Sequence, residues 1–332
     1  MATFPLFAEN APGLVGIARL ASHGVSLSEG HNVEYLTLPA RSLLSRCDSK
    51  RVPFDWTMNP YRGCEFACKY CYARYTHEFM EMRDGLDFES RIFAKQNAGW
   101  LLRRDLKRVK PGEQIAIGAA TDPYQPAERR YRVTREILEE LARHSGLRIG
   151  IISKSTLILR DIDVLQAVAR SNQLGIAITV TTMDIALARK LEPRAPRPDL
   201  RIETVRRLRA ASLDAGILCA PVLPGITDAP ASLTAVARNA AGAGACWFSA
   251  NSLFLMPCSE KIFMPFLELE FPELVEQYRR RYASRAFVGE VYRKRLSELV
   301  RKLRAKYGFN RERYPLADES PNAEREPQMA LF

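Results

Sequence analysis

Short apolar runs alternate with amphipathic segments through the middle of this chain. The apolar runs are rich in β-branched residues and predict strands near residues 56–60, 115–118, 149–152, 176–180, 218–223 and 246–248. The segments between them repeat with a helical period and predict helices near residues 97–108, 134–145, 160–171, 199–215 and 230–243. This alternation predicts an α/β fold of about six βα units on a parallel sheet, for which an open or partial barrel is the best fit.

The flanking segments differ from this central region. Residues 1–54 are expected to form an irregular N-terminal extension, and the first 32 residues a loosely structured leader, because they have no sustained period and many Pro and Gly residues. The barrel is expected to cover residues 55–255. Residues 256–308 predict a helical, basic C-terminal extension, and residues 309–332 a polar, flexible tail.

Composition adds limits on location and chemistry. No apolar run reaches the roughly 18 residues that a membrane span needs, so no membrane partner is expected. The N-terminus has no charged segment followed by an apolar one, and a cytoplasmic location is therefore expected. The seven cysteines are an odd number, which favours reduced, metal-binding or buried thiols over a disulfide framework.

Three of these cysteines fall within eight positions, directly after the first predicted strand. Cys64, Cys68 and Cys71 have C-x3-C-x2-C spacing. Their thiolates are suited to a [4Fe-4S] cluster that keeps one iron without a protein ligand and open to a small molecule. The alternative is a structural zinc site of the Cys3His type, with His77 as the fourth ligand. The spacing alone is compatible with both.

The cysteine loop, with Tyr70 just before its last cysteine, resembles the signature of radical S-adenosylmethionine (radical SAM) enzymes. Its place before five further strands is similar to the partial (βα)6 TIM-like barrel of that superfamily. The resemblance extends to the spore photoproduct lyase branch, often labelled DNA repair photolyase-like, in four segments: residues 59–64, 70–74, 121–128 and 153–155.

This resemblance implies two cofactors, a [4Fe-4S] cluster and S-adenosylmethionine (SAM), and an electron donor such as a flavodoxin or ferredoxin. Reductive cleavage of SAM would give methionine and a 5′-deoxyadenosyl radical that abstracts a hydrogen atom.

One departure limits the resemblance. Spore photoproduct lyases are expected to carry a hydrogen-donor cysteine shortly before the aspartate of the second-strand motif, whereas this chain reads Gly118-Ala119-Ala120-Thr121-Asp122. Literal spore photoproduct lyase activity is therefore not expected.

Polar residues at the ends of the predicted strands are placed to bind SAM, because barrel active sites form from the βα loops at that edge. Thr121 and Asp122 follow the second strand, and Asp122 is suited to accept from the ammonium group of SAM. Lys154 and Ser155 follow the third strand, and the resemblance implies that Lys154 pairs with the carboxylate of SAM. The alternatives are that Asp122 only opens a turn and that Lys154 is a solvated residue at a strand end.

The fourth strand and the cysteine loop complete the predicted cofactor site. Thr181 follows the fourth strand and is suited either to bind the ribose of SAM or to cap a turn. Tyr70 belongs to the signature of the cysteine loop, and Glu192 lies on a later loop of the same rim. The remaining cysteines near late strands, Cys219, Cys246 and Cys258, fit packing better than hydrogen donation, because free cysteine is often buried.

Positive charge is concentrated near the C-terminus of this chain, whose net charge is +11. Residues 278–307 contain eleven Arg or Lys residues against two Glu, with aromatic residues between them. Such a segment predicts a nucleic-acid surface that neutralises phosphates and stacks bases, and the alternative is a solvated, charged helix. The last five residues, Gln328-Met329-Ala330-Leu331-Phe332, resemble the pentapeptide with which bacterial replication and repair proteins dock on the sliding clamp.

These observations favour a radical SAM enzyme that repairs or modifies nucleic acid. Two alternatives stay open from the sequence. One is a radical SAM maturase or biosynthetic enzyme that acts on a protein or a small molecule. The other is a zinc-stabilised nucleic-acid-binding protein without catalysis.

Overall fold

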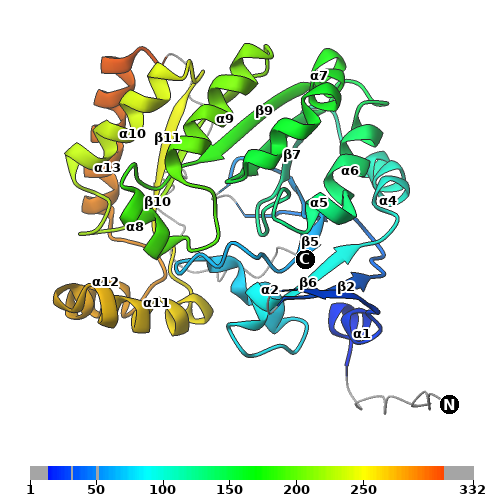
Figure 1. The fold of residues 1–332 in the computed structure, drawn as a ribbon, viewed down its shortest axis with the longest axis horizontal. Helices are drawn as coiled ribbons and strands as arrows, with labels where there is room; N and C mark the ends of the chain where they lie inside the picture. The colour runs from blue at the N-terminus through cyan, green and yellow to red at the C-terminus, as the bar shows by residue number, and fades with distance from the viewer. Residues whose placement is uncertain (1–13, 31–32, 50–51, 310–332) are drawn as a thin grey trace.

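A curved, mostly parallel sheet with helices along one side forms the centre of the computed structural model (Figure 1), which describes residues 14–30, 33–49 and 52–309. The strand order is β11-β10-β9-β8-β7-β4-β3. All neighbours from β4 to β11 are parallel, and β3 pairs antiparallel with β4 at the edge. The bounds are Leu44–Arg46 for β3, Trp56–Met58 for β4, Gln114–Ile117 for β7, Arg148–Ser153 for β8, Gln173–Thr179 for β9, Ala215–Val222 for β10 and Phe248–Ser252 for β11.

Five helices connect these strands and cover one side of the sheet (Figure 1). They are α4 (Ala98–Asp105), α6 (Val133–Leu141), α7 (Ile162–Ser171), α9 (Pro198–Ala210) and α10 (Pro230–Gly242). Shorter helices, α5 (Glu128–Tyr131) and α8 (Ile185–Leu191), lie within the connections. The alternating βα units and the α/β fold predicted from the sequence are confirmed, with strand ends that differ by a few residues.

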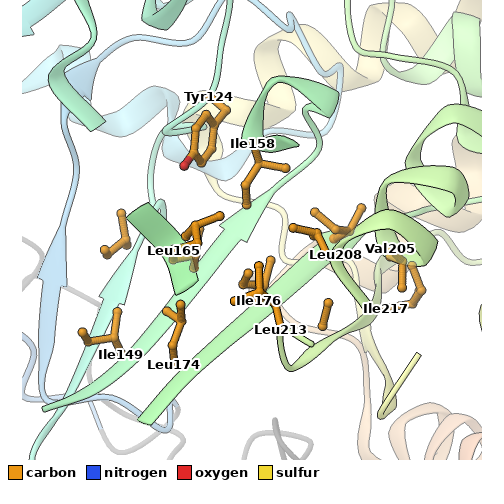
Figure 2. Packing of buried hydrophobic residues seen from close by; sticks show 14 of the residues in the cluster. Tyr124, Ile149, Ile158, Leu165, Leu174, Ile176, Val205, Leu208, Leu213 and Ile217 are labelled. Atoms are coloured by element: carbon orange, nitrogen blue, oxygen red, sulfur yellow. The ribbon is translucent and has the colours of Figure 1, made fainter. Parts of the chain in front are cut away.

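The main hydrophobic core lies between this sheet and the helices (Figure 2). Ile149, Ile176 and Ile217 project from neighbouring strands, and Leu165 and Leu208 meet them from α7 and α9. All five side chains are essentially buried. Near-continuous apolar strands are typical of parallel sheets that are covered on both faces, which is why the sequence pattern located them well.

A second sheet, which the sequence did not predict, packs beside the first. Its order is β1-β2-β6-β5, and it is formed by Ser26–Gly30, Val33–Leu38, Arg91–Lys95 and Tyr61–Arg62 respectively. Because α1 (Gly16–Ser22) and β1 are regular elements, the loosely structured leader was the wrong expectation for residues 16–30. The parallel pairing of β2 with β6 joins segments more than fifty residues apart, and such a contact leaves no local period.

The C-terminal extension is helical, as predicted. It consists of α11 (Pro257–Glu270), α12 (Val275–Tyr282) and α13 (Glu290–Tyr307). In Figure 1, α13 runs beside α10 and β11, and its residues Leu296, Val300 and Leu303 are buried there. Beyond α13, the ring of Phe309 stacks on Phe248 of β11, with centroids 5.8 Å apart. Within the described ranges, no helix has the length and apolar character that crossing a membrane requires.

Gly216 in β10 is expected to tolerate no side chain. A Cβ atom there would lie 2.4 Å from the ring of Trp247, which is fully buried. Overpacking of this kind costs about 1–3 kcal/mol, so Gly216→Ala should lower the midpoint of thermal unfolding by several degrees.

Gly242→Ala is the matched control, because a Cβ atom at Gly242 would have no neighbour within 4 Å. Its midpoint should stay unchanged or rise slightly, since Ala favours the helix by up to about 1 kcal/mol. Equal midpoints for Gly216→Ala and the wild type would contradict the packing described for β10.

Candidate active site

The three cysteines lie on one loop that follows the short strands β4 and β5. All three thiols are free; Cys64 and Cys68 are buried and Cys71 is partly buried. The loop begins at Gly63, whose φ of +81° and close approach to the carbonyl oxygen of Arg91, 2.7 Å from where a Cβ would lie, leave room only for glycine. Ala67 also has a positive φ, of 54°. The backbone is therefore bent twice within the signature.

The donor set of this loop fits an iron-sulfur cluster. Burial raises the pKa of Cys64 and of Cys71 and raises that of Cys68 to about 12, so an apo thiolate would be unfavourable here. A bound metal centre supplies the positive charge that makes such thiolates stable. Across the described part of the chain, no three His, Cys, Asp or Glu side chains are grouped so as to hold a single metal ion. Three free thiols on one loop are the donor set that the predicted [4Fe-4S] cluster requires.

Among the described residues, His77 is not grouped with the three cysteines around a single metal ion. Its Nε2 lies 3.0 Å from the carbonyl oxygen of Arg91, and its ring packs edge-on against Phe88 and Phe93. Burial lowers the pKa of His77 to about 4, so the imidazole is neutral at pH 7. The Cys3His zinc alternative is therefore not supported by the geometry.

The loop after β7 holds the cysteine loop in place. The side chain of Gln125 accepts a hydrogen bond from the backbone N–H of Glu65 at 3.0 Å and donates one to the carbonyl oxygen of Gly63 at 2.9 Å. The carboxylate of Glu65 in turn accepts from the backbone N–H of Ala127 at 2.8 Å. Thr121 Oγ1 donates to the carbonyl oxygen of Tyr61, just before the loop, at 3.1 Å. Gln125 and Glu65 were not predicted as site residues from the sequence.

Asp122 connects the ends of two neighbouring strands. Its Oδ1 accepts from the hydroxyl of Ser153 at 2.8 Å and from the backbone N–H of Tyr124 at 2.9 Å, and its Oδ2 accepts from the backbone N–H of Lys154 at 2.6 Å. Burial raises the pKa of Asp122, although these donors oppose the shift. The carboxylate thus fixes the backbone at Lys154. Its assignment as a partner of the SAM ammonium group stays a prediction.

The side chain of Lys154 lies beside the cysteine loop. Its Nζ is 5.9 Å from the ring centroid of Tyr70 and forms no hydrogen bond or ion pair with a described residue. Burial opposes its positive charge, but electrostatic interactions with Cys68, Glu192 and, more weakly, Asp122 outweigh burial and raise the pKa of Lys154. Lys154 is therefore a charged ammonium group held next to the cysteine loop without a partner of its own.

Glu192 connects three buried side chains of the site. It forms a buried ion pair with Arg201 at 2.5 Å and accepts hydrogen bonds from the hydroxyls of Thr181, at 2.9 Å, and Tyr70. The Tyr70 hydroxyl also lies 3.2 Å from Thr181 Oγ1. The sequence placed Glu192 on the rim without assigning it this role, because its burial and its partner Arg201 are properties of the folded chain alone.

The predicted cofactor contact Ser155 has a local structural partner. Ser155 Oγ accepts from the backbone N–H of Leu157 at 3.2 Å and caps the short 3-10 helix that follows β8. Among the other thiols, Cys219 is buried near the carbonyl oxygen of Thr181, and Cys258 lies 3.7 Å from the carbonyl oxygen of Tyr72. Both positions agree with the packing role predicted for these cysteines.

The aromatic residues of the basic extension are used for packing. The hydroxyl of Tyr278 donates to the carbonyl oxygen of Pro224 at 2.8 Å, and that of Tyr292 donates to Asp228 at 2.9 Å. Tyr282 and Phe287 are likewise half-buried against other residues. These contacts leave Tyr282, Phe287 and Tyr292 half-buried, and the stacking of bases on this segment stays a prediction. The cations remain, and those exposed on α13 are Arg293, Lys294, Arg295, Arg301, Lys302 and Lys306.

Comparisons with known proteins agree with this geometry. A family model described as the radical SAM superfamily matches residues 58–235. An uncharacterised protein of Mycobacterium tuberculosis is 34% identical over 323 residues, which are 97% of this chain and 94% of that protein. An uncharacterised protein of Methanocaldococcus jannaschii is 25% identical over 236 residues, or 71% of this chain and 84% of that protein.

Among solved structures, that of spore photoproduct lyase complexed with dinucleoside spore photoproduct superposes with a TM-score of 0.61. The two chains are 14% identical, and the match covers 82% of this chain and 79% of the lyase. A second structure of that lyase, with bound AdoMet and dinucleoside spore photoproduct, has a TM-score of 0.60 and is 15% identical. At this level of identity the similarity shows a shared fold.

The hydrogen bonds of Gln125 to the cysteine loop are expected to be needed for metal binding. Gln125→Ala removes both bonds and leaves buried backbone groups of residues 63 and 65 unsatisfied, at about 1–3 kcal/mol each. We expect the iron and sulfide content after anaerobic reconstitution to fall at least several-fold. The matched control is Gln166→Ala on the exposed face of α7. Full iron content in Gln125→Ala would show that the loop holds its shape without this clamp.

Proposed function

Because the chain belongs to the radical SAM superfamily and is a radical SAM enzyme, we propose that it cleaves SAM reductively at a [4Fe-4S] cluster bound by Cys64, Cys68 and Cys71 and abstracts hydrogen from a nucleic-acid substrate. The observation that carries this proposal is the set of three free thiols on one loop, beside an ammonium group that forms no ion pair with a described residue, at the carboxyl ends of parallel strands. Barrel enzymes build their active sites at that edge.

When it is bound and reduced, such a cluster supplies the electron that splits SAM into methionine and a 5′-deoxyadenosyl radical. The residues of this chain bind and orient. We assign Lys154 to the carboxylate of SAM, because its charge has no partner among the described residues. Asp122 helps to position Lys154 for this contact, since its carboxylate accepts a hydrogen bond from the Lys154 backbone N–H at 2.6 Å.

The other predicted residues form the walls of the SAM site in this proposal. Tyr70 and Thr181 are joined through Glu192, so their hydroxyls are fixed in direction. Thr121 is tied to the backbone before the cysteine loop, and Ser155 to the turn after β8. Side chains that are already hydrogen-bonded in this way need no rearrangement when a ligand binds, which lowers the entropic cost of binding.

A nucleic-acid substrate is supported by charge. The net charge of the chain is +11, and α13 exposes a row of cations on a face that its apolar residues do not use. A solved structure of similar fold holds a dinucleoside spore photoproduct. Ala119 and Ala120 stand where the lyases are expected to carry a hydrogen-donor cysteine, so we propose repair or modification of a nucleotide by a reaction other than that of the lyase.

Two partner proposals accompany this function. The electron is proposed to come from a flavodoxin or ferredoxin, as membership of the radical SAM superfamily implies. The sliding-clamp motif at residues 328–332 lies outside the described residues, and clamp docking stays a prediction from the sequence.

Anaerobically reconstituted protein, given SAM and a chemical reductant, is expected to form 5′-deoxyadenosine. Cys68→Ala should abolish both the cluster and this product. Lys154→Met should keep the cluster but raise the KM for SAM at least tenfold, because it removes the charge assigned to the SAM carboxylate. Controls are Cys246→Ala, outside the cysteine loop, and Lys261→Met, at an exposed position. A fully loaded wild type that forms no 5′-deoxyadenosine would refute the proposed chemistry.

Nucleic-acid binding is expected to depend on salt through α13. Each cation that contacts a phosphate contributes roughly 0.7 to the slope of log affinity against log salt for a single strand. Changing Arg295, Arg301 and Lys302 to Gln should therefore reduce that slope by up to about 2 for a single-stranded oligonucleotide. The control changes Lys107, Arg143 and Arg170, which are exposed at the other end of the helix layer, to Gln. Equal slopes for the two triple variants would argue for a protein or small-molecule substrate.

A further inference from the structure

Two buried or half-buried cations beside the cysteine loop have no acidic partner. Arg62 ends β5 and Lys95 ends β6, and these strands pair antiparallel. Neither side chain forms an ion pair or a hydrogen bond among the described residues. The carboxylate of Asp105 acts electrostatically on Lys95, but it already accepts from Ser42 and from the backbone N–H groups of residues 43 and 44. Burial, and then Arg62, lower the pKa of Lys95 to about 7.

Two other buried arginines of this protein each have an acidic partner, which Arg62 and Lys95 lack. Arg74 pairs with Glu89 at 2.8 Å, and Arg201 pairs with Glu192 at 2.5 Å. A buried charge is strongly unfavourable unless an opposite charge or several hydrogen bonds compensate it. The pair Arg62 and Lys95 has neither among the described residues, so these charges rely on water or on a bound anion.

Unsatisfied polar atoms also gather around Arg62. The Nε of Arg62 and the hydroxyl of Tyr75 are both buried without a hydrogen-bond partner. Arg62 pairs with Phe93 across β5 and β6, so Arg62 and Lys95 project from the same face of this strand pair, and Tyr75 acts electrostatically on Arg62. A guanidinium, an ammonium and a phenol together offer more donors than acceptors. Such a set matches an anion with several oxygen atoms, above all a phosphate group.

Aromatic rings continue from this cationic group toward the end of β11. Tyr75 stacks on Tyr72 with ring centroids 6.4 Å apart, and Tyr72 meets the ring of Phe254 edge-on at 5.8 Å. Phe254 stacks in turn on Phe287 at 4.4 Å. Tyr72, Phe254 and Phe287 are all partly exposed. Tyr72 directly follows Cys71, so these rings adjoin the proposed metal centre.

We propose that Arg62 and Lys95 bind a phosphate group of the substrate, and that the rings of Tyr72, Phe254 and Phe287 contact the base attached to it. A nucleotide unit combines a multi-oxygen anion with a flat ring, and aromatic side chains hold such rings by stacking. A carboxylate ligand would use the cations but not the aromatic rings. The inference rests on the proposed function and narrows its substrate to a phosphate-bearing nucleotide unit next to the cysteine loop.

Binding measurements with reconstituted holoenzyme test this site without relying on turnover. The probes are thymidylyl-(3′→5′)-thymidine, its neutral methylphosphonate analogue and thymidine monophosphate. The wild type should bind the charged dinucleotide at least tenfold more tightly than the neutral analogue. Arg62→Gln and Lys95→Met should each remove most of this discrimination by weakening only the charged probes. Arg62→Lys, which keeps the positive charge, should retain part of it.

The matched control is Arg170→Gln on the exposed side of α7, which should discriminate like the wild type. A stronger response of thymidine monophosphate than of the dinucleotide would identify a free nucleotide, and the reverse a nucleic-acid strand; both support a phosphate site. Equal affinity of the wild type for charged and neutral probes would overturn the inference even if 5′-deoxyadenosine is formed. A wild type that discriminates but forms no 5′-deoxyadenosine would refute the proposed chemistry and leave the phosphate site standing.

Discussion

The proposed metal centre depends on a loop whose backbone N–H and C=O groups need hydrogen-bond partners from elsewhere in the chain. Gly63 and Ala67 take left-handed conformations within the cysteine signature, so the loop forms neither a helix nor a strand, and its buried N–H and C=O groups need other partners. Gln125 meets two of these groups and Glu65 returns a bond to the opposite loop. The motif after β7 is therefore explained first as a clamp on the cysteine loop. This clamp places the thiols at the carboxyl ends of the strands.

The buried or half-buried cations of the site form two groups, those with an ion-pair partner in the protein and those without one. Arg201 and Arg74 are neutralised within the protein by Glu192 and Glu89, and these pairs fix side chains and loops. Lys154, Arg62 and Lys95 form no such ion pair with a described residue. An unpaired charge is unfavourable in a protein interior. We therefore expect cations without an ion pair to lie where a ligand supplies the opposite charge. The three unpaired cations flank the cysteine loop, which is where substrate and cofactor would meet.

The C-terminal extension shows that one stretch of sequence can serve two purposes. Its aromatic residues interleave with cations along the chain, which resembles a surface for stacking bases. In the fold, the helical period separates the two types, because Tyr278 and Tyr292 turn inward to bond with Pro224 and Asp228 while the cations face outward. The exposed cations of α13 are suited to attract phosphate groups. Rings suited to stack with bases, such as Phe254, lie near the cysteine loop.

The sequence by itself determined the βα series, the cysteine loop and the polar residues at strand ends, because apolar period and ligand spacing are local properties of the chain. It did not reveal the second sheet, the clamp by Gln125 or the ion pair of Glu192 with Arg201. Each of these joins residues that are distant along the chain or depends on burial. The surroundings of His77 were also beyond the sequence, since only the fold turns its Nε2 toward the carbonyl oxygen of Arg91.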